Sequence, residues 1–131
     1  TSPVLVRHDS YIQDAIITLF MYDADVLYVI DEEKELIGIM ARKDLLRASL
    51  SSSINNTPVA VCMTRMPHLI TCNKKMSILE AAALLQDHAI DSLPVVDEEN
   101  DKKIVGSVTK STLLDYIIVQ ARNAEIKREE V

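Results

Sequence analysis

The chain has 131 residues, of which 48% are apolar and only 4% aromatic, so it is large enough for one compact unit with a mainly aliphatic core. Its net charge of −6 argues against a segment that grips a nucleic acid backbone by itself. No run approaches the ~20 apolar residues of a membrane span, no signal peptide opens the chain, and Cys62 and Cys72 lie in no metal or redox motif, so we expect a cytoplasmic protein in a reducing compartment.

Hydrophobic periodicity predicts the order strand, helix, strand, strand, helix for the first part of the chain. Ser10 is the expected cap of the first helix, and Asp31 opens a polar turn between the second and third strands. In chain order, we expect a strand at residues 4–6, a helix from Ser10 to about Asp23, strands at 26–30 and 36–40, and a helix over about 42–50.

A polar loop, residues 49–58, separates this part from a second one with the same order of elements. Here Ser77 is the expected helix cap. We expect a strand at 70–72, a helix from Ser77 to about His88, strands near 93–96 and 104–108, a helix from Thr109 to about Gln120, and a charged tail that is a solvated or fraying helix end.

The two parts are copies of one unit. The run LYVID at 27–31 returns as LPVVD at 93–97, and LIG at 36–38 returns as IVG at 104–106. The offset is 66 residues at the first run and 68 at the glycines, which places two extra residues in the second turn. Two copies of a long repeat indicate a closed pseudo-symmetric pair, and the cleft between them is the first place to expect a ligand.

Three predicted helices are more apolar than a surface helix requires: those around residues 12–21, 78–85 and 113–119. An amphipathic surface helix needs an apolar stripe of only about 100°. The excess predicts a second partner for these helices, which is the other copy, a second chain, or both.

The only two glycines of the chain, Gly38 and Gly106, each begin a glycine–apolar–x–[Thr/Ser]–x–x–Asp pattern at a helix start. A hydroxyl and a carboxylate one turn apart cap a helix, and the carboxylate can also accept two hydrogen bonds from a ribose diol. Phosphates favour the free N–H groups of a helix N-terminus, where Arg42, Lys43 and Lys110 could neutralise them. The spacing alone also fits an ordinary capping box, but its recurrence after a glycine strand in both copies favours a nucleotide site.

The order of elements, the LPVVD run, the glycine strand and the helix start resemble the CBS domain, named for cystathionine β-synthase, in the tandem arrangement called a Bateman module. Residues 61–67 resemble the V-x-x-M-T segment that introduces many second copies, and the resemblance covers about residues 4–122. It implies an α/β (α+β) fold of two pseudo-symmetric β-α-β-β-α repeats packed together. The implied division is a first repeat at 1–50, a linker at 51–66, a second repeat at 67–122 and a charged tail at 123–131.

Residues 41–49 and 63–67 look closer still to one group within the family. These are the Gram-positive repressors of gluconeogenic genes, which carry a winged-helix DNA-binding domain ahead of a CBS pair and respond to adenine nucleotides. The likeness implies an output domain that lies outside these residues.

By this resemblance Asp44 is the expected ribose contact, with Arg42 and Lys43 near the phosphates and Thr109 and Lys110 as second choices. The backbone before LPVV lines the adenine pocket in such modules. That adds six residues to the predicted site: Val26, Leu27, Tyr28, Ser92, Leu93 and Pro94.

Both copies depart from the family pattern. Ala41 replaces the usual hydroxyl in the first copy, and Thr112 replaces the usual carboxylate in the second. Asp91 would repel a phosphate, so one good site and one poor site are expected. Arg65 either reaches into the cleft or forms a surface salt bridge.

No acid–base pair supports catalysis, and His8, His68 and His88 have no metal-ligand spacing, so we expect neither an enzyme nor a metal site. We expect a sensor that binds an adenine nucleotide (AMP, ADP or ATP) as its regulatory ligand and needs no cofactor. It would form a homodimer through its CBS helices and meet DNA only through an N-terminal domain outside these residues. The alternative is a dimerisation scaffold whose nucleotide sites are vestigial.

Overall fold

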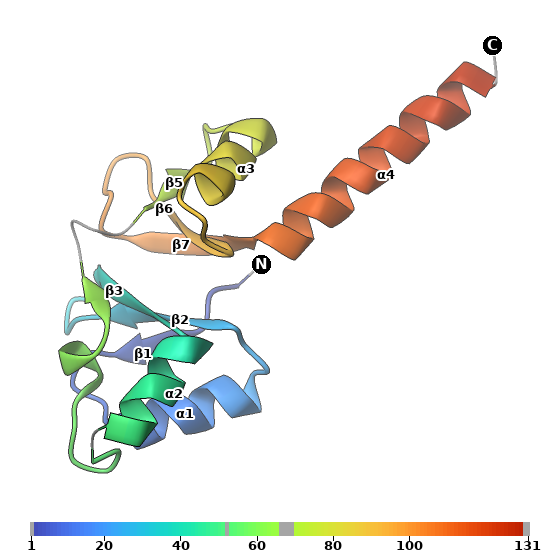
Figure 1. Cartoon of the computed structure of the whole chain (residues 1–131). Helices are drawn as coiled ribbons and strands as arrows, with labels where there is room; N and C mark the ends of the chain where they lie inside the picture. Colours follow the sequence, from blue (N-terminus) through green and yellow to red (C-terminus); the bar gives the residue numbers. More distant parts are fainter. Residues whose placement is uncertain (1, 52, 66–69, 130–131) are drawn as a thin grey trace.

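The computed structural model describes residues 2–51, 53–65 and 70–129. Figure 1 shows two bodies of similar build, one above the other, and the mixed α+β fold with two repeats is confirmed. The first repeat contains β1 (Leu5–Arg7), α1 (Ile12–Met21), β2 (Val26–Ile30), β3 (Leu36–Ala41) and α2 (Arg42–Ser51).

The predicted linker holds a short helical turn, η1 (Val59–Val61), and a short strand, β4 (Thr64–Arg65). Its predicted boundary with the second repeat, between residues 66 and 67, lies outside the described residues. The second repeat contains β5 (Cys72–Asn73), α3 (Ile78–Asp87), β6 (Ser92–Val96), β7 (Ile104–Thr109) and α4 (Lys110–Glu129).

Each repeat forms a sheet of its own, with the order β1-β2-β3-β4 in the first and β5-β6-β7 in the second. The first two strands of each repeat are parallel, and the helix between them, α1 or α3, supplies the crossover that parallel pairing needs. The register of the antiparallel pair shifts between Val29 and Ile30, and at the equivalent step after Val95. Gly38 pairs with the first of these valines and Gly106 with the second, so both glycines lie beside a bulge.

The linker completes the first sheet. β4 pairs antiparallel with β3, which sets Arg65 opposite Gly38 and Thr64 opposite Ile39. A Cβ built on Gly38 would lie 2.9 Å from Cγ of Met63 and 2.9 Å from the carbonyl oxygen of Thr64, and closer still to Sδ of Met63. A glycine is required here because another backbone approaches the strand.

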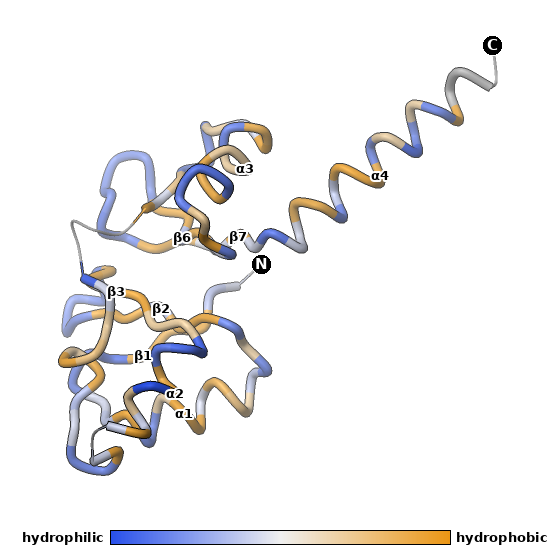
Figure 2. The backbone as a smooth tube through the Cα atoms, viewed as in Figure 1, coloured by the Kyte–Doolittle hydropathy of each residue, from blue (hydrophilic) through white to orange (hydrophobic). Residues whose placement is uncertain are grey.

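Each repeat has an aliphatic core between its sheet and its helices. Ile12, Leu27 and Val59 are fully buried in the first core, and Leu93 is fully buried in the second. Figure 2 shows that hydrophobic residues follow the strands and the inner sides of the helices, whereas the turns are hydrophilic. The near absence of aromatic residues therefore did not prevent two separate cores.

A third cluster joins the repeats. Tyr28, Leu36 and Val96 are only 2%, 1% and 4% exposed and pack against one another. The backbone N–H of Leu36 also donates to the carbonyl oxygen of Lys102 at 2.6 Å, which links β3 of the first repeat to the turn before β7 of the second. The expected packing of one copy against the other is thus built on these strands.

The first helix does not begin as predicted. Ser10 is wrong as its cap: α1 has Tyr11 as N-cap, and the N–H of Tyr11 donates to Oδ2 of Asp14 at 3.0 Å. Ser10 is engaged elsewhere, because its carbonyl accepts the N–H of Val59 at 2.7 Å. The linker therefore fixes the chain ahead of α1.

The second repeat follows the prediction at this point. The hydroxyl of Ser77 caps α3 and accepts the N–H of Glu80 at 3.1 Å. Both α1 and α3 are followed by a residue in the left-handed region, Asp23 at φ 48° and Ala89 at φ 52°. The sharp turn from each helix into the next strand is thus a repeated feature.

The last helix is longer than predicted. α4 continues past the expected end near Gln120 to Glu129, and it takes in much of the predicted tail. Leu113 is buried, but every described side chain from 114 to 126 is exposed, and Figure 1 shows α4 extending away from the sheets. Within the described residues, no helix combines the length and the apolar character needed to cross a membrane.

We expect Gly38→Ala to lower the free energy of unfolding by about 1–3 kcal/mol, because the new methyl group overlaps Met63 and the backbone of Thr64. Urea denaturation measures the loss. Gly106→Ala, at the equivalent register on β7, is the matched control; among the described residues β7 is the edge strand of its sheet, so the added methyl group should cost less than at Gly38. An equal loss at both glycines would contradict this explanation.

Candidate functional site

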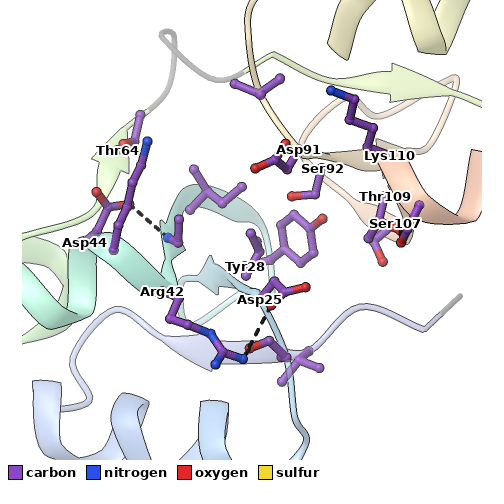
Figure 3. Close-up of a pocket in the computed structure, with 18 of the residues that line it drawn as sticks. Asp25, Tyr28, Arg42, Asp44, Thr64, Asp91, Ser92, Ser107, Thr109 and Lys110 are labelled. Atoms are coloured by element: carbon purple, nitrogen blue, oxygen red, sulfur yellow. Dashed lines mark hydrogen bonds and ion pairs between the residues drawn. The ribbon is translucent and has the colours of Figure 1, made fainter. Parts of the chain in front are cut away.

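A cleft of about 1340 Å³ opens between the two repeats (Figure 3). The starts of α2 and α4 and the strands β2, β3, β6 and β7 contribute to its walls. Most of the residues predicted for the site line it: Val26, Tyr28, Arg42, Lys43, Asp44, Ser92, Thr109 and Lys110.

Three predicted residues lie in the interior instead. Leu27 and Leu93 are fully buried in the cores of their repeats, and Pro94 is also fully buried. Side chains alternate along a strand, so Val26 and Tyr28 face the cleft while Leu27 between them faces the helices. The prediction for these segments concerned their backbone, and its contact with an adenine remains a prediction.

Two further residues predicted for the site, Arg65 and Thr112, are not among those that line the cleft. Arg65 is not among the residues that line the cleft, and its guanidinium donates to the carbonyl oxygen of Ala60 in the linker at 2.7 Å. Thr112 does not line the cleft either, because its hydroxyl lies 2.6 Å from Oγ1 of Thr109 and faces the start of its own helix. Arg65 makes no salt bridge within the described residues, so neither of its two expected roles is seen.

The starts of α2 and α4 are held in place by the same backbone bond. The N–H of Arg42 donates to the carbonyl oxygen of Asp25 at 3.0 Å, and the N–H of Lys110 donates to that of Asp91 at 2.8 Å. Each bond ties a helix N-terminus to the residue just before β2 or β6. Two helix N-termini, each with partial positive charge, therefore open on the same cleft.

Asp44 is both a structural cap and a cleft residue. Its Oδ2 accepts the N–H of Ala41 at 2.9 Å, which satisfies one donor at the start of α2. Within the described part of the chain, no hydrogen bond reaches its other oxygen, Oδ1. That oxygen is available to a ligand hydroxyl.

The start of α4 carries hydroxyls instead of a carboxylate. Oγ1 of Thr109 accepts the N–H of Thr112 at 3.2 Å and lies 3.2 Å from the hydroxyl of Ser111. The cap is therefore neutral, and these hydroxyls already satisfy one another. The two sides of the cleft differ in charge although their backbones are alike.

The charges around the cleft balance. Four acidic side chains and four basic ones line it: Asp23, Asp25, Asp44 and Asp91, with Arg42, Lys43, Arg47 and Lys110. Arg42 donates to the carbonyl oxygen of Ala24 at 3.0 Å and lies 3.4 Å from the carboxylate of Asp25 and 3.9 Å from that of Asp23. Of the cations predicted near phosphates, Arg42 is thus the one already engaged with carboxylates.

Several residues that line the cleft were not predicted from the sequence, among them Arg47, Ser107 and Thr64. A signal existed for two of them. Arg47 follows Lys43 by four residues on α2 and so lies on the same helix face, and Ser107 precedes Thr109 by two on β7 and so shares its strand face. Thr64 gave no local signal, because only the pairing of β4 with β3 brings it to the cleft.

Tyr28 reaches across the cleft from the first repeat to the second. Its phenol is almost fully buried, and burial raises its pKa above the usual value. The hydroxyls of Ser92 and Ser107 lie beside it and act in the opposite direction, by interacting with the phenolate form. Tyr28 therefore belongs both to the contact between the repeats and to the wall of the cleft.

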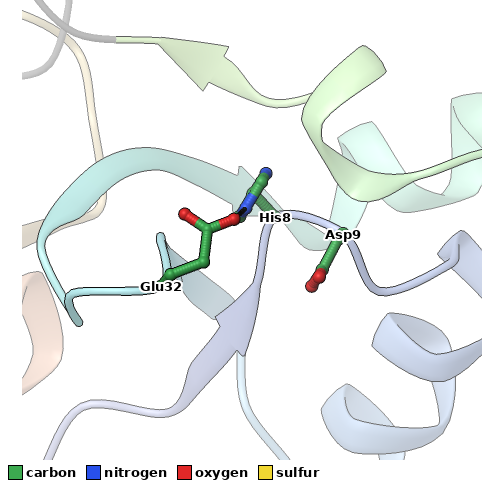
Figure 4. Close-up of side chains that lie close together, drawn as sticks. All are labelled: His8, Asp9 and Glu32. Atoms are coloured by element: carbon green, nitrogen blue, oxygen red, sulfur yellow. Dashed lines mark hydrogen bonds and ion pairs between the residues drawn. The ribbon is translucent and has the colours of Figure 1, made fainter.

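A second polar cluster lies apart from the cleft. Figure 4 shows His8, Asp9 and Glu32, whose potential metal-ligating atoms lie within 4.8 Å of one another. The spacing of these residues in the sequence did not predict this group. Nε2 of His8 is 2.7 Å from Oε1 of Glu32, and Asp9 already accepts two hydrogen bonds of 3.0 Å from Arg7, which lower the pKa of its carboxyl. The Arg7–Asp9 ion pair is local to the end of β1, and the contact between His8 and Glu32 joins the end of β1 to the turn before β3.

Comparison with known proteins identifies both repeats. The chain matches the family model of the CBS domain over residues 1–51 and again over 59–119. The transcriptional repressor CcpN of Bacillus subtilis (strain 168) is 34% identical over 123 residues, which cover 92% of this chain and 58% of CcpN. An inosine-5'-monophosphate dehydrogenase of Aquifex aeolicus (strain VF5) is 32% identical over 82% of this chain, but the match covers only 21% of that enzyme.

Solved structures show the same fold. The CBS domain pair of protein MJ0100, in complex with 5'-methylthioadenosine and S-adenosyl-L-methionine, superposes with a TM-score of 0.79 at 23% identity, over 92% of this chain and 91% of that one. The cytosolic domain of the Mg²⁺ channel MgtE, in complex with ATP, gives a TM-score of 0.71 at 30% identity, over 87% of this chain and 44% of that one.

The buried phenol of Tyr28 predicts a pH dependence of stability. Its pKa is raised in the folded state, so the unfolded chain loses this proton first, and the free energy of unfolding should fall as the pH rises above about 10. Comparison of urea denaturation at pH 8 to 11 for the native chain and Tyr28→Phe isolates the effect. The variant should lose stability less steeply, and identical slopes would contradict the assignment.

Proposed function

Because this chain belongs to the CBS-domain family and carries two CBS domains in tandem, we propose that it is a regulatory, ligand-sensing module whose ligand is an adenine nucleotide bound between the repeats. The observation that carries the proposal is the convergence of two helix N-termini on one cleft, with Asp44 at one of them. Such a site offers a carboxylate to a ribose and N–H groups with basic side chains to phosphates.

The ribose is assigned to the α2 side of the cleft. Asp44 presents a free oxygen there, whereas the hydroxyls at the start of α4 are bonded to one another. Lys43 and Lys110 lie on opposite walls of the cleft. We assign the phosphates to these two lysines, since Arg42 is already paired with Asp25. One strong site and one weaker site follow from this asymmetry.

The adenine is assigned to the apolar part of the cleft, to which both repeats contribute. Val26 and Ile39 line it from the first repeat, and Ile70 and Ile90 line it from the second. Burial of a purine between these aliphatic side chains gains hydrophobic free energy without requiring aromatic stacking. The absence of Trp and the single Phe in the chain are compatible with this mode of binding.

Relatives support the ligand class. The MgtE domain is described in a complex with ATP, and the MJ0100 pair with two adenosine derivatives. Each of those ligands contains adenosine, and they differ in the charge of the group attached to it. We therefore propose that the module recognises the adenosine part of its ligand. Titration identifies the group attached to that adenosine.

The response would be passed to an attached domain. This chain spans 58% of CcpN, a transcriptional repressor, so we propose that the longer protein controls transcription through a DNA-binding domain outside these residues. The ligand must bind two arrangements of the module with different affinity, because equal affinity shifts no equilibrium. A coupling of about 1–3 kcal/mol is typical of such regulation. We propose no catalytic role, since the match to the dehydrogenase is confined to about a fifth of that enzyme.

A dimerisation scaffold is the second candidate. Phe20 on α1, Leu50 on α2 and Leu79 on α3 are 86%, 83% and 74% exposed. Large apolar side chains exposed on several helices are typical of surfaces that a protein partner covers. On this reading the cleft would be vestigial and the helices would carry the function.

Titration of the purified chain with AMP, ADP, ATP, NAD and S-adenosylmethionine tests ligand sensing. A ligand that binds only the folded chain should raise its stability by about 2.7 kcal/mol at one hundred times the dissociation constant. We expect a saturable thermal shift with at least one of these adenosine compounds. A flat response to all of them would favour the scaffold.

Asp44→Ala should weaken binding of the active compound about 10- to 100-fold, because a hydrogen bond to a charged group contributes about 1.5–3 kcal/mol. The substitution also removes a helix cap, which should cost about 1 kcal/mol of stability. Ser77→Ala is the matched control: it removes the cap of α3, away from the cleft, and should lower stability similarly while leaving the dissociation constant unchanged. Calorimetric titration of both variants measures the difference, and equal weakening in both would contradict a direct contact by Asp44.

A further inference from the structure

The two repeats place different side chains at equivalent positions of their central strands. Tyr28 of β2 pairs with Ile39 of β3, and Pro94 of β6 pairs with Ser107 of β7. Each pair lies one step from the pair that contains the glycine of its repeat. Tyr28 therefore corresponds to Pro94, and Ile39 corresponds to Ser107.

The same strands offer the cleft two pairs of side chains at matching positions. Val26 and Ile39 line it from the first repeat, and Ser92 and Ser107 line it from the second. We call Val26 and Ile39 the first half-site, and Ser92 and Ser107 the second half-site. The first half-site presents aliphatic side chains and the second presents hydroxyls, so the two are unequal surfaces for an adenine.

The phenol of Tyr28 already covers the second half-site. Its ring reaches across from the first repeat, and the hydroxyls of Ser92 and Ser107 lie beside it (Figure 3). Tyr28 is 2% exposed and Ser92 is 8% exposed, whereas Val26, at the position equivalent to Ser92, is partly exposed. The smaller of these two residues is the more buried one because the phenol lies over it.

The pseudo-symmetry does not repeat this cover on the first half-site. Pro94 stands at the position from which a second aromatic side chain would have to extend, and it is fully buried. Its ring is too short to reach from β6 across to Val26 and Ile39. The duplicated backbone therefore has two half-sites, and the first is the one open to the cleft.

We propose that Tyr28 limits the module to one adenosine-containing ligand, because its phenol fills the space that an adenine would need at the second half-site. This role of Tyr28 rests on the proposed nucleotide function and adds what sets the number of ligands. The single ligand binds at the first half-site, on the side where Asp44 caps α2 and lines the cleft. Tyr28 acts by excluding a second ligand and requires no contact with the first.

Moving the phenol out of the second half-site would disturb the contact between the repeats. Tyr28 packs with Leu36 and Val96 in the cluster that joins them. An adenine that displaced the phenol would have to expose this apolar surface to water, which opposes binding. The exclusion is therefore built into a side chain that also holds the repeats together.

The missing carboxylate of the second repeat is the competing explanation for a single ligand. Thr112 stands at the position equivalent to Asp44, so a second ribose would lack its acceptor. The two explanations differ in what restores a second site. A carboxylate at residue 112 is sufficient if only the acceptor is missing, but it is not sufficient if the phenol blocks the adenine.

Calorimetric titration with AMP and ATP counts the ligands bound per chain and separates the two explanations. We expect one ligand for the native chain and one for Thr112→Asp, since Tyr28 is intact in both. Tyr28→Leu/Thr112→Asp should bind two, because leucine keeps an apolar contact with Leu36 and Val96 but lacks the ring. Tyr28→Phe/Thr112→Asp is the matched control, and it should bind one because its ring remains.

Three results would overturn this role of Tyr28. They are two ligands on the native chain, two on Thr112→Asp, and one on Tyr28→Leu/Thr112→Asp. The first two counts are made with Tyr28 unchanged, so they stand even if the double variant proves unstable. No binding by any of the four forms would instead overturn the proposed function, and the role of Tyr28 would fall with it.

Discussion

Tyr28, Leu36 and Val96 are buried where the two sheets meet, and the rest of the molecule depends on that contact. Each repeat is small, and a domain of about 60 residues buries only about 60% of its unfolded surface. The shared cluster, together with the bond from Leu36 to Lys102, gives each repeat a second partner. The same contact also creates the cleft. The walls of the cleft are the parts of the two repeats that lie beside this contact and remain separated.

The two halves of the cleft have the same backbone and different chemistry. The bond from a helix N–H to the residue before the central strand is repeated at Arg42 and Lys110. One helix then begins with the carboxylate of Asp44 and the other with the hydroxyls of Thr109 and its neighbours. A duplicated fold thus keeps its main-chain geometry while its side chains become specialised.

The sequence was informative where local chemistry decides the structure. The repeat, the strands, the Ser77 cap and the start of α2 follow from periodicity and capping. Tertiary contacts decided the rest: the linker engages Ser10, and Arg65 reaches Ala60. The end of α4 near Gln120 was placed too early, although no glycine or proline follows to stop the helix and the tail was expected to be a solvated or fraying helix end. The predicted contacts between these residues and a nucleotide remain predictions.

α4 gives the second repeat a mechanical property that the first repeat lacks. Beyond Leu113 the helix has no buried residue among those described, and from there to Glu129 it spans about 24 Å at 1.5 Å per residue. A stiff rod that pivots at its base acts as a lever. A rotation of the second repeat by about 10° would displace the far end by about 4 Å, given that length. Small changes at the cleft, where α4 begins, would therefore become large movements at its tip.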